Sequence, residues 1–168
     1  MKLFLKKLIL SLAIITASSA ITVANAKTLS GTPKTVHKKF NAAAKKIRTN
    51  NRMVLTRCSR KVASVCNYTV TGNLAAIAKS KNGQFDKLED IILIFAKGSN
   101  GNDMIIAMGL LMITYSPRID KAERGEALVS LSKMVTTGET KRSVVLDDVK
   151  YTFTNLGIGG FWFTVSGN

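Results

Sequence analysis

Metal ligands and acidic side chains are scarce in this sequence. The chain of 168 residues contains one His, two Cys and 10 Asp and Glu. A structural metal site takes about four ligands, and a single His without a third Cys gives no such set. The sequence also lacks the Gly-x-Ser-x-Gly, Walker A and His-Glu-x-x-His patterns of common enzyme sites. We therefore expect no metal, no cofactor and no catalytic residues, and we rank an enzyme below a binding protein.

The sequence also lacks an apolar run as long as the roughly 20 residues that a membrane-spanning helix needs. Residues 1–26 instead combine a positive start, MKLFLKK, a short apolar stretch, LILSLAIITA, and an Ala-x-Ala site that ends at Ala26. This pattern is typical of a secretory signal peptide. Ser18, Ser19 and Thr22 interrupt the apolar stretch and argue against an uncleaved anchor. We expect cleavage after Ala26 and a mature protein in the periplasm or the medium.

The two cysteines, Cys58 and Cys66, both lie in the expected mature chain. Two thiols in an exported protein favour a disulfide, and the alternative is two buried free thiols. Residues 53–59 and 64–71 have the composition of strands, with residues 60–64 turning between them. We therefore predict a structural disulfide that joins two neighbouring strands.

Acidic residues are absent from one long stretch of the mature chain. Without the three lysines of the signal peptide, the chain carries 22 Lys and Arg against 10 Asp and Glu. Residues 27–85 hold 13 of these basic residues and no acid, whereas residues 86–168 hold nine basic residues and all 10 acids. Asymmetry of this kind indicates an anionic partner.

The acid-free stretch contains the segment KKFNAAAKKIRTN, residues 38–50. Apolar residues around it recur with the helical period, so we predict a helix over residues 35–49 that buries Val36, Phe40, Ala43, Ala44 and Ile47. Its lysines and the arginines that follow would then form one basic surface, or simply a solvated helix face without a ligand. The predicted anion-binding residues are Lys38, Lys39, Lys45, Lys46, Arg48, Arg52, Arg57 and Arg60.

Periodicity and turn residues predict the remaining elements. Residues 27–34 are expected to be a flexible leader. An apolar helix over 104–115, capped by Asn102 or Asp103, should precede a helix that starts after Asp120, ends before Gly138 and buries Ala127, Leu128, Leu131 and Val135. Strands are predicted over 53–59, 64–71, 73–80, 88–96, 141–146, 149–154 and 161–165. This order predicts a single α+β domain over 35–168, in which an antiparallel sheet of about six to seven strands packs against the N-terminal helix and two central helices.

The charge pattern best fits a non-catalytic binding or adaptor protein for an anionic partner. Lipid headgroups, lipopolysaccharide phosphates and an acidic protein all have the required charge, so peripheral membrane contact belongs to this hypothesis. Nucleic acid is disfavoured because the basic stretch has few aromatic side chains on which bases could stack. The alternative is a small secreted enzyme or an enzyme inhibitor. The sequence leaves the oligomeric state open.

Overall fold

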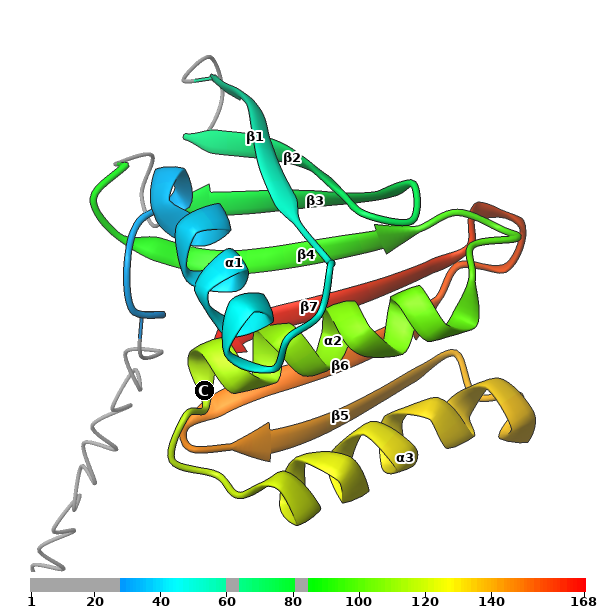
Figure 1. Cartoon of the computed structure of the whole chain (residues 1–168). Coiled ribbons are helices and arrows are strands. Elements are labelled where there is room, and N and C mark those ends of the chain that lie inside the picture. The colour runs from blue at the N-terminus through cyan, green and yellow to red at the C-terminus, as the bar shows by residue number, and fades with distance from the viewer. Residues whose placement is uncertain (1–27, 60–63, 81–84) are drawn as a thin grey trace, which may run out of the picture.

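Residues 28–59, 64–80 and 85–168 are described by the computed structural model. They form three helices and seven strands, which together make an α+β domain (Figure 1). The helices are α1 (Val36–Lys46), α2 (Gly101–Tyr115) and α3 (Lys121–Thr137). The strands are β1 (Met53–Ser59), β2 (Val65–Val70), β3 (Leu74–Ser80), β4 (Leu88–Phe95), β5 (Lys141–Leu146), β6 (Val149–Asn155) and β7 (Phe161–Gly167).

The strands form one antiparallel sheet with the order β1-β2-β3-β4-β7-β6-β5. The first four strands follow one another as a meander, and the chain then crosses to the far edge through α2 and α3. The last strand, β7, returns to pair with β4 and joins the two parts of the sheet. β4 is therefore an interior strand, which agrees with its predominantly apolar sequence.

The sheet packs against the three helices, as predicted, and all three cover the same face (Figure 1). α1 packs beside β1 and α2, while α3 packs against β5 and β6. Alternate strand residues face these helices and are fully buried, among them Leu93 and Phe163 at the centre of the sheet. Burial of apolar area at this helix–sheet interface is the main contribution to folding.

The helix ends follow local capping rules. Asp120 caps α3 by accepting a hydrogen bond from the Glu123 N–H (2.8 Å), and Gly138 ends it in the left-handed conformation. Both features were predicted. α2 begins three residues earlier than predicted because Asn100 is its cap, accepting from the N–H groups of Asn102 and Asp103.

Two helical residues predicted to be buried are exposed. Ile47 is 48 % exposed because α1 ends at Lys46 and Ile47 follows as its C-cap. In α3 the buried stripe runs through Ala127, Leu131 and Met134, so that Val135 is 52 % exposed. The buried stripe keeps the helical period, but its last residue is Met134 instead of the predicted Val135.

The expected flexible leader is partly packed on the domain. Leu29 is buried, and its backbone N–H donates a hydrogen bond to the Leu88 carbonyl (3.1 Å) at the start of β4. A short 3-10 turn at Pro33–Thr35 then leads into α1. The apolar side chain of Leu29 explains the difference, because its burial against the start of β4 is favourable.

The predicted disulfide between Cys58 and Cys66 is present. The two residues lie directly opposite each other in β1 and β2, with 4.1 Å between their Cα atoms. The predicted turn at residues 60–64 falls mostly outside the described residues. A β-bulge between Leu55 and Arg57 shifts the pairing of β1 ahead of the disulfide, and this shift affects the candidate site.

Candidate anion-binding surface

α1 presents a basic side and buries an apolar side. Val36, Phe40, Ala43 and Ala44 face the sheet. The Asn41 amide fixes the helix to β1, since it donates to the Met53 carbonyl (2.9 Å) and accepts from the Met53 N–H (2.8 Å). The lysines on the opposite side of α1 are therefore held in place by the packing beneath them.

A tyrosine lies under α1 on the sheet. Tyr68 is 2 % exposed, and its hydroxyl donates to the Pro33 carbonyl just before the helix. The ring of His37 lies 6.0 Å from the ring of Tyr68, and its Nδ1 is buried without a hydrogen-bond partner. His37 itself is half-buried. Burial raises the pKa of Tyr68 to about 12, so the hydroxyl stays protonated at alkaline pH values where an exposed tyrosine ionises.

The helix ends at an arginine with a positive φ angle. Arg48 has φ 57°, and the N–H groups of Arg48 and Thr49 donate to the carbonyls of Lys45 and Ala44, respectively. This is the Schellman arrangement, in which glycine is the usual residue. A side chain in this conformation costs roughly 1–2 kcal/mol. At this position the chain therefore carries an exposed guanidinium where glycine would be favoured by conformation alone.

Five of the eight predicted anion-binding residues lie together. We call them the α1 basic face, and all five are exposed. Lys38 and Lys45 are two helical turns apart on one side of α1, and the others lie at its C-terminal end. The Arg52 guanidinium reaches back to the Thr49 carbonyl (3.0 Å), which places it next to the end of the helix. The α1 basic face consists of Lys38, Lys45, Lys46, Arg48 and Arg52.

Three of the eight predicted anion-binding residues are not part of the α1 basic face. Lys39 is half-buried, and its Nζ donates to the Ser30 carbonyl (2.8 Å) and hydroxyl (2.9 Å). Arg57 pairs with Asn67 on the opposite face of the sheet, because the bulge reverses the alternation of β1 after Leu55. Arg60 lies outside the described residues.

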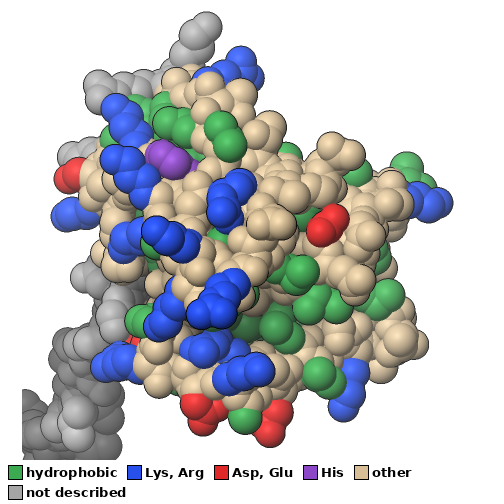
Figure 2. All heavy atoms as spheres, in the orientation of Figure 1, with side chains coloured by type: hydrophobic (Ala, Val, Ile, Leu, Met, Phe, Trp, Pro, Cys, Tyr) green, Lys and Arg blue, Asp and Glu red, His purple; other side chains and the backbone are tan. Residues whose placement is uncertain are grey.

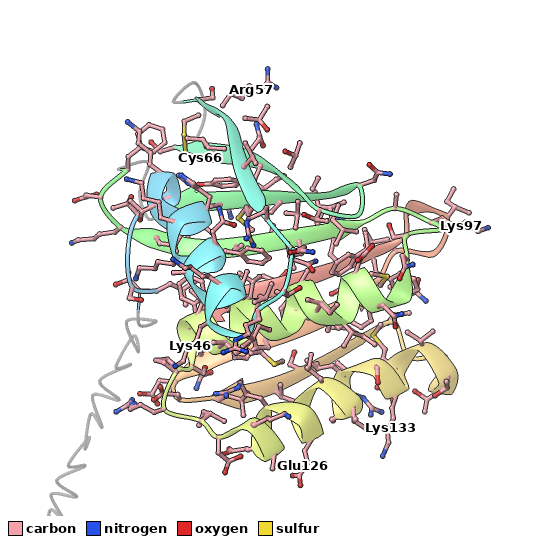
Figure 3. All side chains as sticks on the ribbon, viewed as in Figure 1. Lys46, Arg57, Cys66, Lys97, Glu126 and Lys133 are labelled. Atoms are coloured by element: carbon pink, nitrogen blue, oxygen red, sulfur yellow. A yellow bond between two sulfur atoms is a disulfide. The ribbon has the colours of Figure 1, made fainter. Side chains whose placement is uncertain are left out.

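The α1 basic face has no ion-pair partner within the described parts of the chain. The ion pairs there are Lys79–Asp90, Arg118–Asp147 and Arg142–Glu139. Figure 2 shows Lys and Arg side chains gathered over the α1 side of the helical layer, with Lys46 of Figure 3 at the end of α1. Cations near a helix C-terminus also stabilise the helix through its dipole, so part of this pattern serves the fold.

Sequence reasoning missed how some cations in this region are held. The Lys34 ammonium lies 5.0 Å from the centre of the Phe85 ring, and Lys39 lies 6.0 Å from the Tyr115 ring. Aromatic faces attract cations at such distances. No local pattern indicates these contacts, because the rings are far away in the sequence.

A small pocket lies beside Lys39, because Ser30 and Tyr115, which both contact the Lys39 ammonium, are among its lining residues. Its volume is about 190 Å³, and the Arg118 guanidinium at its wall pairs with both carboxylate oxygens of Asp147. None of its lining residues is a histidine or a cysteine. The lining residues are Thr28, Leu29, Ser30, Tyr115, Arg118, Asp147, Asp148, Val149 and Gly167.

The described residues contain no cluster of three or more metal-ligating side chains. No helix in the described part of the chain has the length and apolarity to cross a membrane. No family model, curated protein or solved structure matches the chain.

Proposed function

We propose that this protein is an exported, non-catalytic binding or adaptor protein that holds an anionic partner on the α1 basic face. The observation that carries this proposal is a set of five exposed cations on and just after a packed helix, without a carboxylate partner among the described residues. Such a face attracts anions over a distance of about 10 Å at moderate salt. Export rests on the signal-peptide pattern of residues 1–26, and an intact mass beginning at Lys27 tests it.

The partner classes differ in how they present negative charge. Phospholipid headgroups and lipopolysaccharide phosphates form extended anionic surfaces, whereas an acidic protein presents separate carboxylates. The α1 basic face has both single-point lysines and planar guanidinium groups, which suit phosphate and carboxylate alike. An anionic lipid surface is the first probe because several exposed lysines can contact it at once, each contributing about 1 kcal/mol.

The test compares two triple variants of equal charge. Lys38, Lys45 and Lys46 are changed to Gln in one, which keeps helix propensity and avoids carboxylates at the negative end of α1. The matched control changes Lys97, Lys133 and Lys150, which are exposed on the loop after β4, on α3 and on the sheet face opposite the helices, to Gln. Figure 3 shows Lys97 and Lys133 at the opposite side of the molecule from α1.

Both variants and the wild type are sedimented with phosphatidylglycerol-containing vesicles and with neutral vesicles. Wild-type protein should bind only the anionic vesicles, and the α1 variant should bind roughly 100-fold less, as the loss of about 3 kcal/mol implies. The control should bind like the wild type. If both variants lose binding equally, net charge rather than the α1 basic face is responsible. If wild type binds neither these vesicles nor polyglutamate, the face is only solvated.

A further inference from the structure

The face of the sheet opposite the helices carries an unexpected apolar patch. Within residues 28–59, 64–80 and 85–168, no helix or strand packs on this face. Antiparallel sheets with one solvated face usually place polar residues there. Here Ile77 lies opposite Ile92, and Ile94 lies between Ala75 and Trp162. We call Ala75, Ile77, Ile92, Ile94 and Trp162 the central apolar patch.

The register shows that this patch points away from the core. Its members alternate along β3, β4 and β7 with Ala76, Leu93 and Phe163, which are buried under the helices. Trp162 is 38 % exposed and Ala75 is exposed, while the three isoleucines are half-buried. Contiguous apolar side chains on an exposed sheet surface mark an interaction site more often than isolated ones do.

Positive charge lies at both lateral edges of the same face. Arg57 is exposed on β1, and Lys141 and Lys150 are exposed on β5 and β6. Lys79 and Asp90 also face this side, but they form an ion pair of 3.3 Å and largely cancel. The uncovered face therefore has an apolar centre, Ser and Thr side chains around it, and edges that carry these basic residues together with the exposed Val54 and Val145.

We propose that this uncovered face is a docking surface for an acidic protein. The partner's apolar side chains cover the central apolar patch, and its carboxylates meet Arg57, Lys141 and Lys150. An apolar centre inside a polar rim is the usual build of a protein interface, and rim charges select partners of opposite sign. The inference is independent of the α1 basic face, which lies on the other layer of the domain.

The charge pattern argues against a second copy of this chain as the occupant. In a face-to-face dimer with its two-fold axis along the strands, the β1 edge covers the β5 edge, so Arg57 meets Lys141 and Lys150. With the axis across the strands, Arg57 meets Arg57 of the second copy. Both arrangements oppose like charges, which an acidic partner avoids.

The first test uses the only tryptophan of the chain, Trp162. Anilinonaphthalene sulfonate combines an aromatic body with a negative charge and should quench Trp162 fluorescence in the folded protein. Ile94→Thr should weaken this binding, and Val129→Thr on α3, which is 56 % exposed, should not. Replacing Arg57, Lys141 and Lys150 by Gln should weaken it roughly ten-fold at low salt. Absence of quenching, or equal quenching in Ile94→Thr, would overturn the proposal.

The second test identifies the occupant in cells that produce the full chain. A benzophenone amino acid is placed at position 94, and at position 129 as the control. The proposal requires an adduct at position 94 whose cross-linked peptide contains Asp or Glu beside apolar residues. That partner, once purified, must shift Trp162 emission and bind the triple Gln variant roughly ten-fold more weakly. An adduct with a second copy, an adduct with phospholipid, or no enrichment over position 129 would each refute it.

Discussion

The two parts of the chain, residues 28–85 and residues 86–168, differ in how most of their bound cations are held, although Lys79 of the first part pairs with Asp90 and Arg124 of the second part binds the Ile119 carbonyl. In the second part, Arg118 pairs with Asp147 and Arg142 pairs with Glu139. In the first part, which has no acid, Lys39 binds a backbone carbonyl and Arg52 binds the carbonyls of Thr49 and Asn51. Carbonyls and aromatic rings satisfy donors without cancelling their charge. The positive excess of the first part therefore persists in the folded protein.

The largest expected effect concerns the three tyrosines, which come from both parts and are all buried. Burial raises the pKa of Tyr68 to about 12 and the pKa values of Tyr115 and Tyr151 further. Above about pH 10 the unfolded chain releases these protons and the folded chain does not, so stability is full below that pH and falls above it. The free energy of unfolding should fall by about 4 kcal/mol per pH unit, at roughly 1.4 kcal/mol for each tyrosine.

Urea unfolding at increasing alkaline pH checks this slope, and tyrosinate absorbance checks that the folded protein does not ionise near pH 10. Tyr68 is the one tyrosine of the first part, so Tyr68→Phe should remove about one third of the slope and measures the contribution of that part. An unchanged slope in this variant would mean that Tyr68 ionises in the folded state, and that α1 does not shield it.

A smaller effect is expected from the covalent bond that only the first part contains. β1 and β2 are joined by the Cys58–Cys66 disulfide, whereas β5 and β6 are joined only by the two-residue turn Asp147–Asp148. Replacing both cysteines by Ala should lower the free energy of unfolding by about 2.5 kcal/mol, the loop-closure value for this separation. Urea unfolding of the oxidised wild type and the double variant measures the difference. Equal stability would show that the sheet alone constrains this hairpin.

The smallest expected effect distinguishes cations that pair with carboxylates from cations that bind backbone carbonyls. The hydrogen bond from Arg142, followed by that from Thr137, lowers the pKa of Glu139. A lowered pKa adds stability above the unfolded value of 4.5 that is lost as pH falls through the folded value. The loss should be small because the pair is exposed to solvent.

Thermal midpoints measured from neutral to acidic pH test this difference. Glu139→Gln should flatten the acidic part of the profile. Lys39→Gln should lower the whole profile without changing its shape, because carbonyls do not titrate. If both variants change the profile in the same way, the comparison between the two parts fails.

Local patterns were sufficient to predict most of the fold. Strand alternation, the Asp120 cap and Gly138 gave the elements within a few residues, and two cysteines in facing strands gave the disulfide. The candidate site was harder because it depends on tertiary geometry. The bulge in β1 moves Arg57 to the other face, and Ser30 reaches Lys39 only after residues 28–30 pack on the domain. Neither a bulge nor such a distant contact leaves a periodic signal.

The position of β7 between β4 and β6 has a consequence for the order of folding. The meander β1–β4 can form as soon as its residues are available, but its β4 edge stays open until β7, the last strand in sequence, pairs with it. That edge carries the sequence Ile91 to Phe95, which is apolar on both sides. An open apolar edge strand pairs readily with other chains, and such non-local closure is slow. The protein is therefore most exposed to aggregation before β7 pairs with β4, and a variant that lacks β7 should be insoluble.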